Sequence, residues 1–271
     1  MSHTRKAQPR AADVRVYAGV RVVSLNVNGV RSAVRKGLPA LLDELAPDVV
    51  CLQEVRADPE QVPALADGLH ASWHPAERKG YSGVATLSRV APGRVRVGIG
   101  SPEFDSEGRV LVTELPQLTV LNVYAPSGTT GEYRQAVKMA FLGRFLGFVA
   151  GLVSEGRPLL VCGDINIAHR EVDLKNWRAN QKSSGFLPEE RAWFSELLGL
   201  GLVDVVRRLA GEDTPVYSWW TQRAGARERN VGWRIDYQLA TPDLAAKAVR
   251  FEVPRFPVLS DHAPVVVDYS L

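Results

Sequence analysis

One local pattern occurs six times in this chain of 271 residues: a short apolar run that stops at a carboxylate, an amide, a tyrosine or a histidine. Runs of this length, rich in β-branched residues, predict strands. Because ligands of open α/β sheets bind where strand ends meet, we expect these polar residues to converge. They are Asn26 and Asn28 (LNVN), Glu54 (CLQE), Tyr124 (LNVY), Asp164 and Asn166 (CGDIN), Asp236 (WRIDY), and Asp261 and His262 (LSDH).

A simpler explanation exists for each run, because polar residues also begin wherever a strand ends. At GDINIAH (163–169) alone, an Asx-rich turn that stops the strand explains the residues slightly better than a binding site does. Alternation along the strand would nevertheless turn Asp164 and Asn166 to the same side. The recurrence at six strand ends favours a site.

The order of the predicted elements mixes βαβ units with hairpins. We expect helices at 38–46, 132–156 and 188–201, and strands at 20–27, 48–54, 158–166, 233–241 and 263–271, with short antiparallel strands between about 70 and 124. A weak helix is expected between 55 and 69. No linker-like stretch divides the chain, so the pattern predicts a layered α/β sandwich forming one domain over 15–271, preceded by a basic, disordered tail at 1–14.

Composition limits the class of protein. Hydrophobic residues make up 45% and charged residues 23%, as in ordinary globular proteins. No apolar run approaches the ~18–20 residues of a membrane span, and no secretion signal follows the basic N-terminus. Cys51 and Cys162 lie in apolar strand runs, which predicts buried free thiols and a cytoplasmic location, at the nucleoid if the source is bacterial. The net charge of +3 is compatible with a polyanionic partner.

The residues at the strand ends support one kind of chemistry. Glu54 and the aspartates offer hard oxygen ligands without a matching Cys/His cluster, which favours Mg²⁺ or Mn²⁺ over zinc. His262 can donate a hydrogen bond to a phosphate oxygen while Asp236 fixes its tautomer. Asp164 can accept a proton from an attacking water that Asn166 positions. The implied reaction is metal-assisted hydrolysis of a phosphodiester.

The ordered set of motifs resembles the exonuclease/endonuclease/phosphatase superfamily, and within it the exonuclease III class of apurinic/apyrimidinic (AP) endonucleases. The resemblance runs from about residue 20 to the C-terminus. It rests on SLNVNGVRS (24–32), DVVCLQE (48–54), GYSGVATLS (80–88), NVYAPSG (122–128), GDINIAHREVDL (163–174), GFLPEERAWF (185–194), YSWWTQR (217–223), NVGWRIDY (230–237) and SDHAPV (260–265).

The resemblance implies a four-layer αββα sandwich of two mixed sheets, with the site at one edge. It implies a metal shell formed by Asn26, Asn28, Glu54, Asp164, Asn166, Asp261 and His262, and a catalytic set formed by Tyr124, Asp164, Asn166, Asp236 and His262. Either Asp164 or a Tyr124 phenolate would act as the base. Asn28 departs from the aspartate that the family often has at this position.

The superfamily also cleaves phospholipids and inositol phosphates, so the metal site does not select the substrate. Arginines interleaved with tryptophans at 217–237 favour DNA. The resemblance implies a pocket for a flipped abasic sugar formed by Trp219, Trp233 and Ile235. It implies DNA-backbone contacts by Arg31, Lys36, Tyr81, Arg109, Asn176 and Asn180. Trp220 is interpreted as a core residue.

The sequence therefore predicts a monomeric Mg²⁺-dependent DNA-repair enzyme that cuts 5′ of abasic sites in double-stranded DNA, with 3′-phosphodiesterase/phosphatase and 3′→5′ exonuclease activities. The short loop at 127–132, with Ser127 where relatives often have Asn or Gln, leaves the balance of these activities open. The alternatives are a lipid-phosphate phosphodiesterase and a binding module without catalysis.

Overall fold

The computed structural model describes residues 19–271, so the predicted tail at 1–14 lies outside the described residues. Two sheets of six strands face each other. The strands of the first sheet are, in spatial order, β11 (Ala248–Glu252), β12 (Val265–Tyr269), β1 (Val20–Asn26), β2 (Val49–Gln53), β4 (Val84–Ser88) and β3 (His70–His74). The strands of the second sheet are, in spatial order, β5 (Arg94–Val97), β6 (Val110–Glu114), β7 (Thr119–Tyr124), β8 (Leu159–Asp164), β10 (Asp236–Ala240) and β9 (Val203–Asp204).

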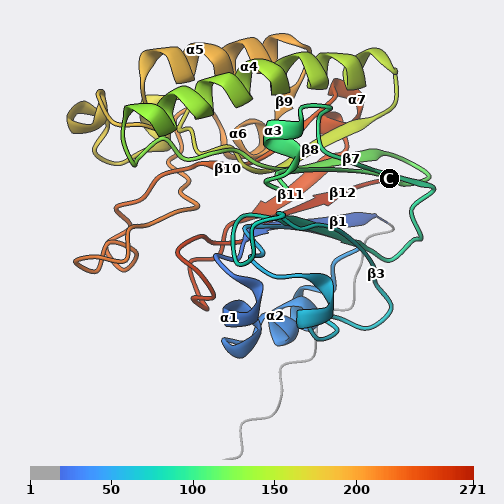
Figure 1. Cartoon of the computed structure of the whole chain (residues 1–271). Helices are drawn as coiled ribbons and strands as arrows, with labels where there is room; N and C mark the ends of the chain where they lie inside the picture. The colour runs from blue at the N-terminus through green and yellow to red at the C-terminus, as the bar shows by residue number, and fades with distance from the viewer. Residues whose placement is uncertain (1–18) are drawn as a thin grey trace, which may run out of the picture.

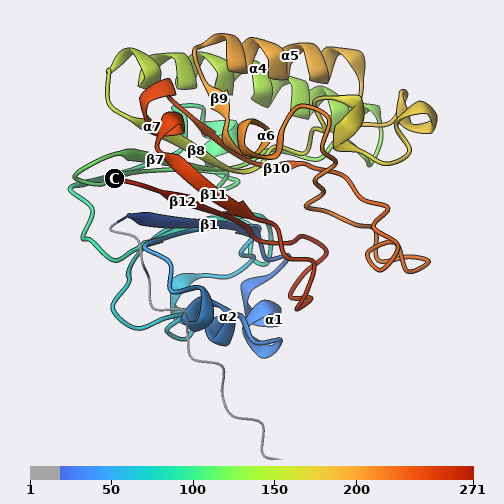
Figure 2. The same cartoon turned by 180° about the vertical axis from the view of Figure 1, so that it is seen from behind.

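Helices cover the outer faces of both sheets (Figures 1 and 2). α1 and α2 lie against the first sheet, and α4 and α5 lie against the second. The predicted αββα sandwich is confirmed. The helices are α1 (Val30–Arg35), α2 (Leu38–Leu45), α3 (Pro102–Asp105), α4 (Glu132–Ser154), α5 (Pro188–Gly199), α6 (Val205–Ala210) and α7 (Pro242–Ala246). Only a 3₁₀ turn at Pro59–Gln61 forms where a weak helix was expected.

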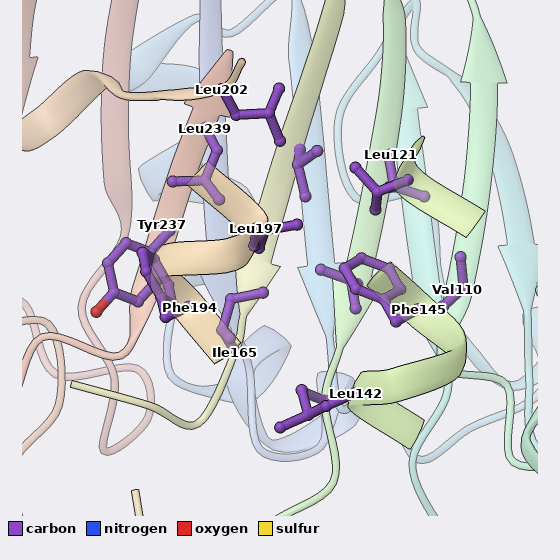
Figure 3. Packing of buried hydrophobic residues seen from close by; sticks show 14 of the residues in the cluster. Val110, Leu121, Leu142, Phe145, Ile165, Phe194, Leu197, Leu202, Tyr237 and Leu239 are labelled. Carbon is purple, nitrogen blue, oxygen red and sulfur yellow. The ribbon is translucent and has the colours of Figure 1, made fainter. Parts of the chain in front are cut away.

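α4 is the longest helix of the described chain, and by length and apolarity it would suffice to cross a membrane. In this fold one face of the helix is buried instead. Phe145 packs on the second sheet together with Phe194 and Leu197 of α5 (Figure 3). Phe141 and Val149 belong to the same buried cluster. The helix therefore acts as an outer layer of the sandwich.

The space between the sheets is filled by a second apolar cluster that includes Val22, Val120 and Val267. Cys51 of β2 and Cys162 of β8 also lie there, both buried and free, as predicted. Burial, with Cys51 beside it, raises the pKa of the Cys162 thiol well above its ordinary value. The thiols are therefore packing groups of the core.

Each sheet has a parallel pair of strands joined through outer helices, β1 with β2 and β7 with β8. Parallel neighbours end at the same edge, so Asn26 lies beside Gln53 and Tyr124 lies beside Asp164 in register. β10 runs antiparallel to β8 and brings Asp236 opposite Asp164. The polar strand ends of the two sheets thus gather at one edge of the sandwich.

Candidate active site

An Asx turn follows the strand at the centre of each sheet. The backbone N–H of Asn28 donates to Oδ1 of Asn26 at 2.9 Å, and the N–H of Asn166 donates to Oδ1 of Asp164 at 2.9 Å. Asn28 and Asn166 have positive φ, of 44° and 57°, so they have left the strand and its alternation. The Asx turn that stops the strand also places the polar residues of the site. The turn explanation and the binding-site explanation of GDINIAH (163–169) are therefore compatible.

Asp164 lies at the centre of the cluster and is buried. The amide nitrogen of Asn26 donates to Oδ2 of Asp164 at 2.9 Å and to Oε2 of Glu54 at 3.0 Å, which links the two sheets. The amide of Asn166 donates to the carbonyl of Ala125 and, at 3.3 Å, to Oδ2 of Asp164. These donors fix the carboxylate of Asp164 in one orientation.

His262 is oriented by Asp236, whose carboxylate is in turn held by Ser218. Its Nδ1 lies 2.9 Å from Oδ2 of Asp236, and that oxygen also accepts the hydroxyl of Ser218 at 2.6 Å. With Nδ1 engaged, Nε2 faces Asp164, 3.9 Å from its Oδ2. The arrangement orients the ring as the sequence predicted for Asp236.

The pKa values of His262 and Asp164 are both raised, for different reasons. Burial alone would lower the pKa of His262, but the carboxylates of Asp236 and Asp164 outweigh it and raise the pKa to about 10. Burial raises the pKa of Asp164 to about 7, and the His262 cation opposes that rise. Burial, followed by the charges of Glu54 and Asp164, raises the pKa of Tyr124 well above its ordinary value. A neutral phenol is a poor base, so these shifts favour Asp164 as the base.

These shifts predict a pH-dependent stability of the metal-free protein. Both pKa values are raised on folding, so the stabilisation is present at low pH and is lost as pH rises through about 7 for Asp164 and about 10 for His262. Between pH 7 and 9.5 the melting temperature in EDTA should fall by at least about 4 °C. The fall in melting temperature should be clearly smaller for His262→Gln than for the wild type. An equal fall in the two proteins would contradict the raised pKa assigned to His262.

The donors at this edge suit a hard divalent cation. Glu54, Asp164 and Asp261 supply carboxylate oxygens, and both cysteines lie elsewhere in the core. Asp164, Asp236 and His262 also have ligand atoms within 4.8 Å of one another, although Nδ1 of His262 is already engaged by Asp236. Asn26 turns its amino group to two carboxylates and its oxygen to Asn28, so metal ligation by Asn26 would need the opposite amide orientation. The carboxylate set fits Mg²⁺ or Mn²⁺, which would supply Lewis-acid stabilisation of a phosphate.

A cavity of about 760 Å³ opens over these groups. One wall is apolar: the rings of Trp219 and Trp233 meet edge to face with centroids 6.3 Å apart, and Ile235 lies beside them. The indole N–H of Trp219 donates to Asp261 at 3.0 Å, and Asp261 also accepts the amide of Asn28 at 2.9 Å. The cavity is also lined by small or polar residues: Ser127, Gly128, Thr129, Gly131, Gln135, Lys182, Ser183 and Ser184.

The strand predicted from residue 233 begins only at Asp236. Trp233 pairs with Trp219 through isolated bridge contacts instead, and the Arg234 N–H donates to the carbonyl of Asp173 at 2.7 Å. These bonds hold residues 233–235 against the cavity. Trp220 is buried, as the core interpretation expected.

The predicted DNA contacts lie in different environments. Arg31 and Asn176 are exposed, and Asn180 donates to the carbonyl of Asn176 at 2.8 Å. Lys36 is exposed and donates to the Leu259 carbonyl at 3.0 Å. These residues lie outside the cavity, and their contact with a DNA backbone stays a prediction.

Arg109 is only 2% exposed and lies behind two tyrosines. Its guanidinium donates to the Tyr124 carbonyl and to the Tyr81 hydroxyl, both at 3.0 Å, and pairs with Glu107. Its side chain thus supports Tyr124, which borders the cavity, and contact with a DNA backbone stays a prediction for Arg109. The burial of Arg109 could not be predicted, because a single arginine in a strand pattern does not indicate whether its side chain is buried or exposed.

Several residues at the site escaped prediction from the sequence. Ser218 accepts the N–H groups of Ile235 and Asp236, at 3.2 and 3.1 Å, while it donates to Asp236. Arg56 lies at the cavity and pairs with Glu54. In the sequence, Ser218 could have been noticed because it directly precedes Trp219, and Arg56 because it lies two residues after Glu54.

Comparison with known proteins agrees with this geometry. The model of the Endonuclease/Exonuclease/phosphatase family matches residues 23–262. The chain belongs to this family. The resemblance stated from the motifs is therefore confirmed.

Family members of known structure and name are similar over most of the chain. An exodeoxyribonuclease of Bacillus subtilis is 38% identical, over 91% of this chain and 98% of its own. The DNA repair nuclease APEX1 of Danio rerio is 36% identical, over 92% and 82%. The structure of an AP endonuclease from Archaeoglobus fulgidus superposes with a TM-score of 0.85 at 28% identity, covering 93% of this chain and all of that one.

Proposed function

We propose that this protein is a Mg²⁺-dependent DNA hydrolase that cuts the backbone 5′ of abasic sites and also removes residues or blocking groups from 3′ ends. One observation carries the proposal: Asp164 and His262, with atoms 3.9 Å apart, lie beside Glu54 under a cavity with an apolar wall of Trp219 and Trp233. The names of the similar family members, an exodeoxyribonuclease and a DNA repair nuclease, support DNA as the substrate.

The residues divide the chemistry between them. Asp164, with its raised pKa, takes a proton from the attacking water that Asn166 orients. His262, kept cationic by Asp236, donates a hydrogen bond to the scissile phosphate and balances its growing charge. Tyr124 keeps its proton and donates it as a hydrogen bond at the same phosphate. Glu54 would hold the divalent ion, which when bound would supply Lewis-acid stabilisation of the leaving oxygen.

The apolar wall accounts for the choice of an abasic site. A deoxyribose without a base can pack against the rings of Trp219 and Trp233, whereas an intact nucleotide carries a polar base into the same space. Exposed cations outside the cavity, such as Arg31, would neutralise backbone phosphates. A monomer is sufficient because the site is complete within one chain.

A labelled duplex with one central abasic analogue, compared with an intact duplex, tests the function. In Mg²⁺ we expect a single cut 5′ of the abasic position, and in EDTA we expect none. A ladder from the 3′ ends of both duplexes would make the protein chiefly an exonuclease. Cleavage of neither duplex would contradict the proposal, and cleavage of a phospholipid in its place would support the alternative enzyme class.

Trp233→Ala should weaken selection of the abasic site more than the chemistry. Loss of one aromatic packing partner should reduce the preference for the abasic duplex over the intact one on the order of tenfold. Turnover at saturating abasic DNA should change much less. Trp73→Ala, in the edge strand β3, serves as the control for general loss of stability. Equal effects of the two substitutions would argue against a pocket role for Trp233.

A further inference from the structure

A buried ion pair lies directly behind the cavity without lining it. Lys138 of α4 and Glu190 of α5 have side chains only 1% and 0% exposed, and Nζ lies 2.6 Å from Oε1. Burial lowers the pKa of Lys138, and the charge of Glu190 opposes this. A buried ion pair is often no more stabilising than apolar residues of equal volume, so stability alone does not explain its presence.

Glu190 holds one wall of the cavity by its backbone. Its Oε2 accepts the N–H of Gly185 at 2.6 Å and the N–H of Leu187 at 3.0 Å. Its Oε1 accepts the amide of Gln135 at 3.0 Å, and Gln135 in turn accepts the hydroxyl of Ser184 at 2.7 Å. Residues 182–187, here called the strap, are therefore tied to the N-terminal turn of α5, where a carboxylate is favoured.

Lys138 holds the other side of the site. Its Nζ donates to the backbone carbonyl of Asn166 at 2.8 Å, immediately beyond the Asx turn of Asp164. Asn166 has a φ of 57°, a conformation that costs energy for a residue other than glycine and that persists where neighbours hold it. Lys138 is thus one of the groups that fix the turn on which Asn166 is presented.

The strap also meets the apolar wall. Gly185 has a φ of 94°, and a side chain there would lie 3.3 Å from the Trp233 ring and 3.1 Å from the Asn166 carbonyl oxygen. Gly185 therefore fits between the apolar wall and the Asn166 turn. Any shift of the strap changes the width of the cavity beside Trp233.

We propose that Lys138 and Glu190 are a positioning pair that fixes the Asn166 turn and the strap relative to each other, so that the reacting groups and the sugar pocket keep one spacing. The effect on catalysis rests on the proposed function, because it assumes that the cavity holds the scissile phosphate and its sugar. Neither residue touches the substrate.

The test neutralises the pair without leaving a lone buried charge. In the double variant Lys138→Met/Glu190→Gln, the introduced amide oxygen can still accept a strap N–H, whereas the bond to the Asn166 carbonyl is lost. Arg21→Met/Asp268→Asn is the matched control, because that ion pair (2.7 Å) joins β1 to β12 and does not line the cavity. Steady-state cleavage of the abasic duplex and hydrogen exchange of the 182–187 amides are measured for the wild type and both variants.

We expect kcat of the double variant to fall at least about tenfold with KM within about threefold, because the reacting groups lose their spacing while the DNA surface is unchanged. Exchange of the strap amides should accelerate in this variant only. A kcat within twofold of the wild type, or an equal loss in the control, would overturn the proposal.

Hydrogen exchange separates this proposal from the proposed function. If the wild-type protein fails to cut abasic DNA, the proposed function is wrong, but the exchange measurement still applies to the pair. Unchanged protection of the strap amides in the double variant would then overturn the positioning role as well.

Discussion

Replacing Asp164 with asparagine should reduce turnover of an abasic duplex by roughly 10²–10⁴-fold, the range for loss of a general base or a charge-stabilising group. The amide has almost the same shape as the carboxylate and can still accept the hydrogen bond from Asn26. It cannot take a proton from water or balance the His262 cation. Single-turnover cleavage in Mg²⁺ measures the effect, and fluorescence anisotropy in EDTA measures DNA binding, which should change little.

The control for this substitution is Asp105→Asn. Asp105 also accepts backbone N–H groups, from Ile99, Gly100 and Ser101, but does not line the cavity. The turnover of the Asp105→Asn variant should stay close to that of the wild type. If Asp164→Asn kept wild-type turnover, Asp164 would not be the base, and Tyr124 would become the candidate despite its raised pKa.

Arg234→Met should be among the most destabilising single substitutions, by about 3–5 kcal/mol, the range for removing one partner of a buried ion pair. Arg234 is buried, and its guanidinium donates to Asp173 and to Asp204, both at 2.7 Å. The substitution leaves Asp204 without that partner and Asp173 with Arg207 as its remaining ion-pair partner. The free energy of unfolding in urea measures the loss.

A surface pair provides the comparison. Arg250 pairs with Glu252 in β11, with both side chains largely exposed, and such pairs contribute about 0–1 kcal/mol. Arg250→Met should therefore leave the unfolding free energy nearly unchanged. A loss below about 1 kcal/mol for Arg234→Met would show that water or neighbouring residues compensate the two carboxylates.

The sequence was sufficient to predict the parts of the site that depend on local pattern. The apolar runs located the strands, and the polar residues after them meet at one edge because β1 and β2, like β7 and β8, run parallel. Predicted and observed bounds agreed closely where apolar periodicity was strong, as in α2, which was predicted at 38–46 and spans Leu38–Leu45. The pattern overextended the strand at 233–241 because contacts to distant residues, Trp219 and Asp173, replace the sheet there.

Partners that are distant in the sequence could not be predicted from pattern. Lys138 and Glu190 are separated by 52 residues, and each resembles an ordinary surface charge on a helix when read alone. The hint was a lysine inside an otherwise apolar helix face. Arg109 gave no comparable hint, because a strand pattern does not tell whether an arginine faces water or fills a gap beneath two tyrosines.

The bond between Asn26 and Asp164 joins residues 138 positions apart, and His262 lies nine residues from the last residue, Leu271. The reacting groups can therefore meet only after both sheets have docked and β12 has inserted beside β1. A chain truncated before His262 would lack both this histidine and β12, and would therefore have no complete site.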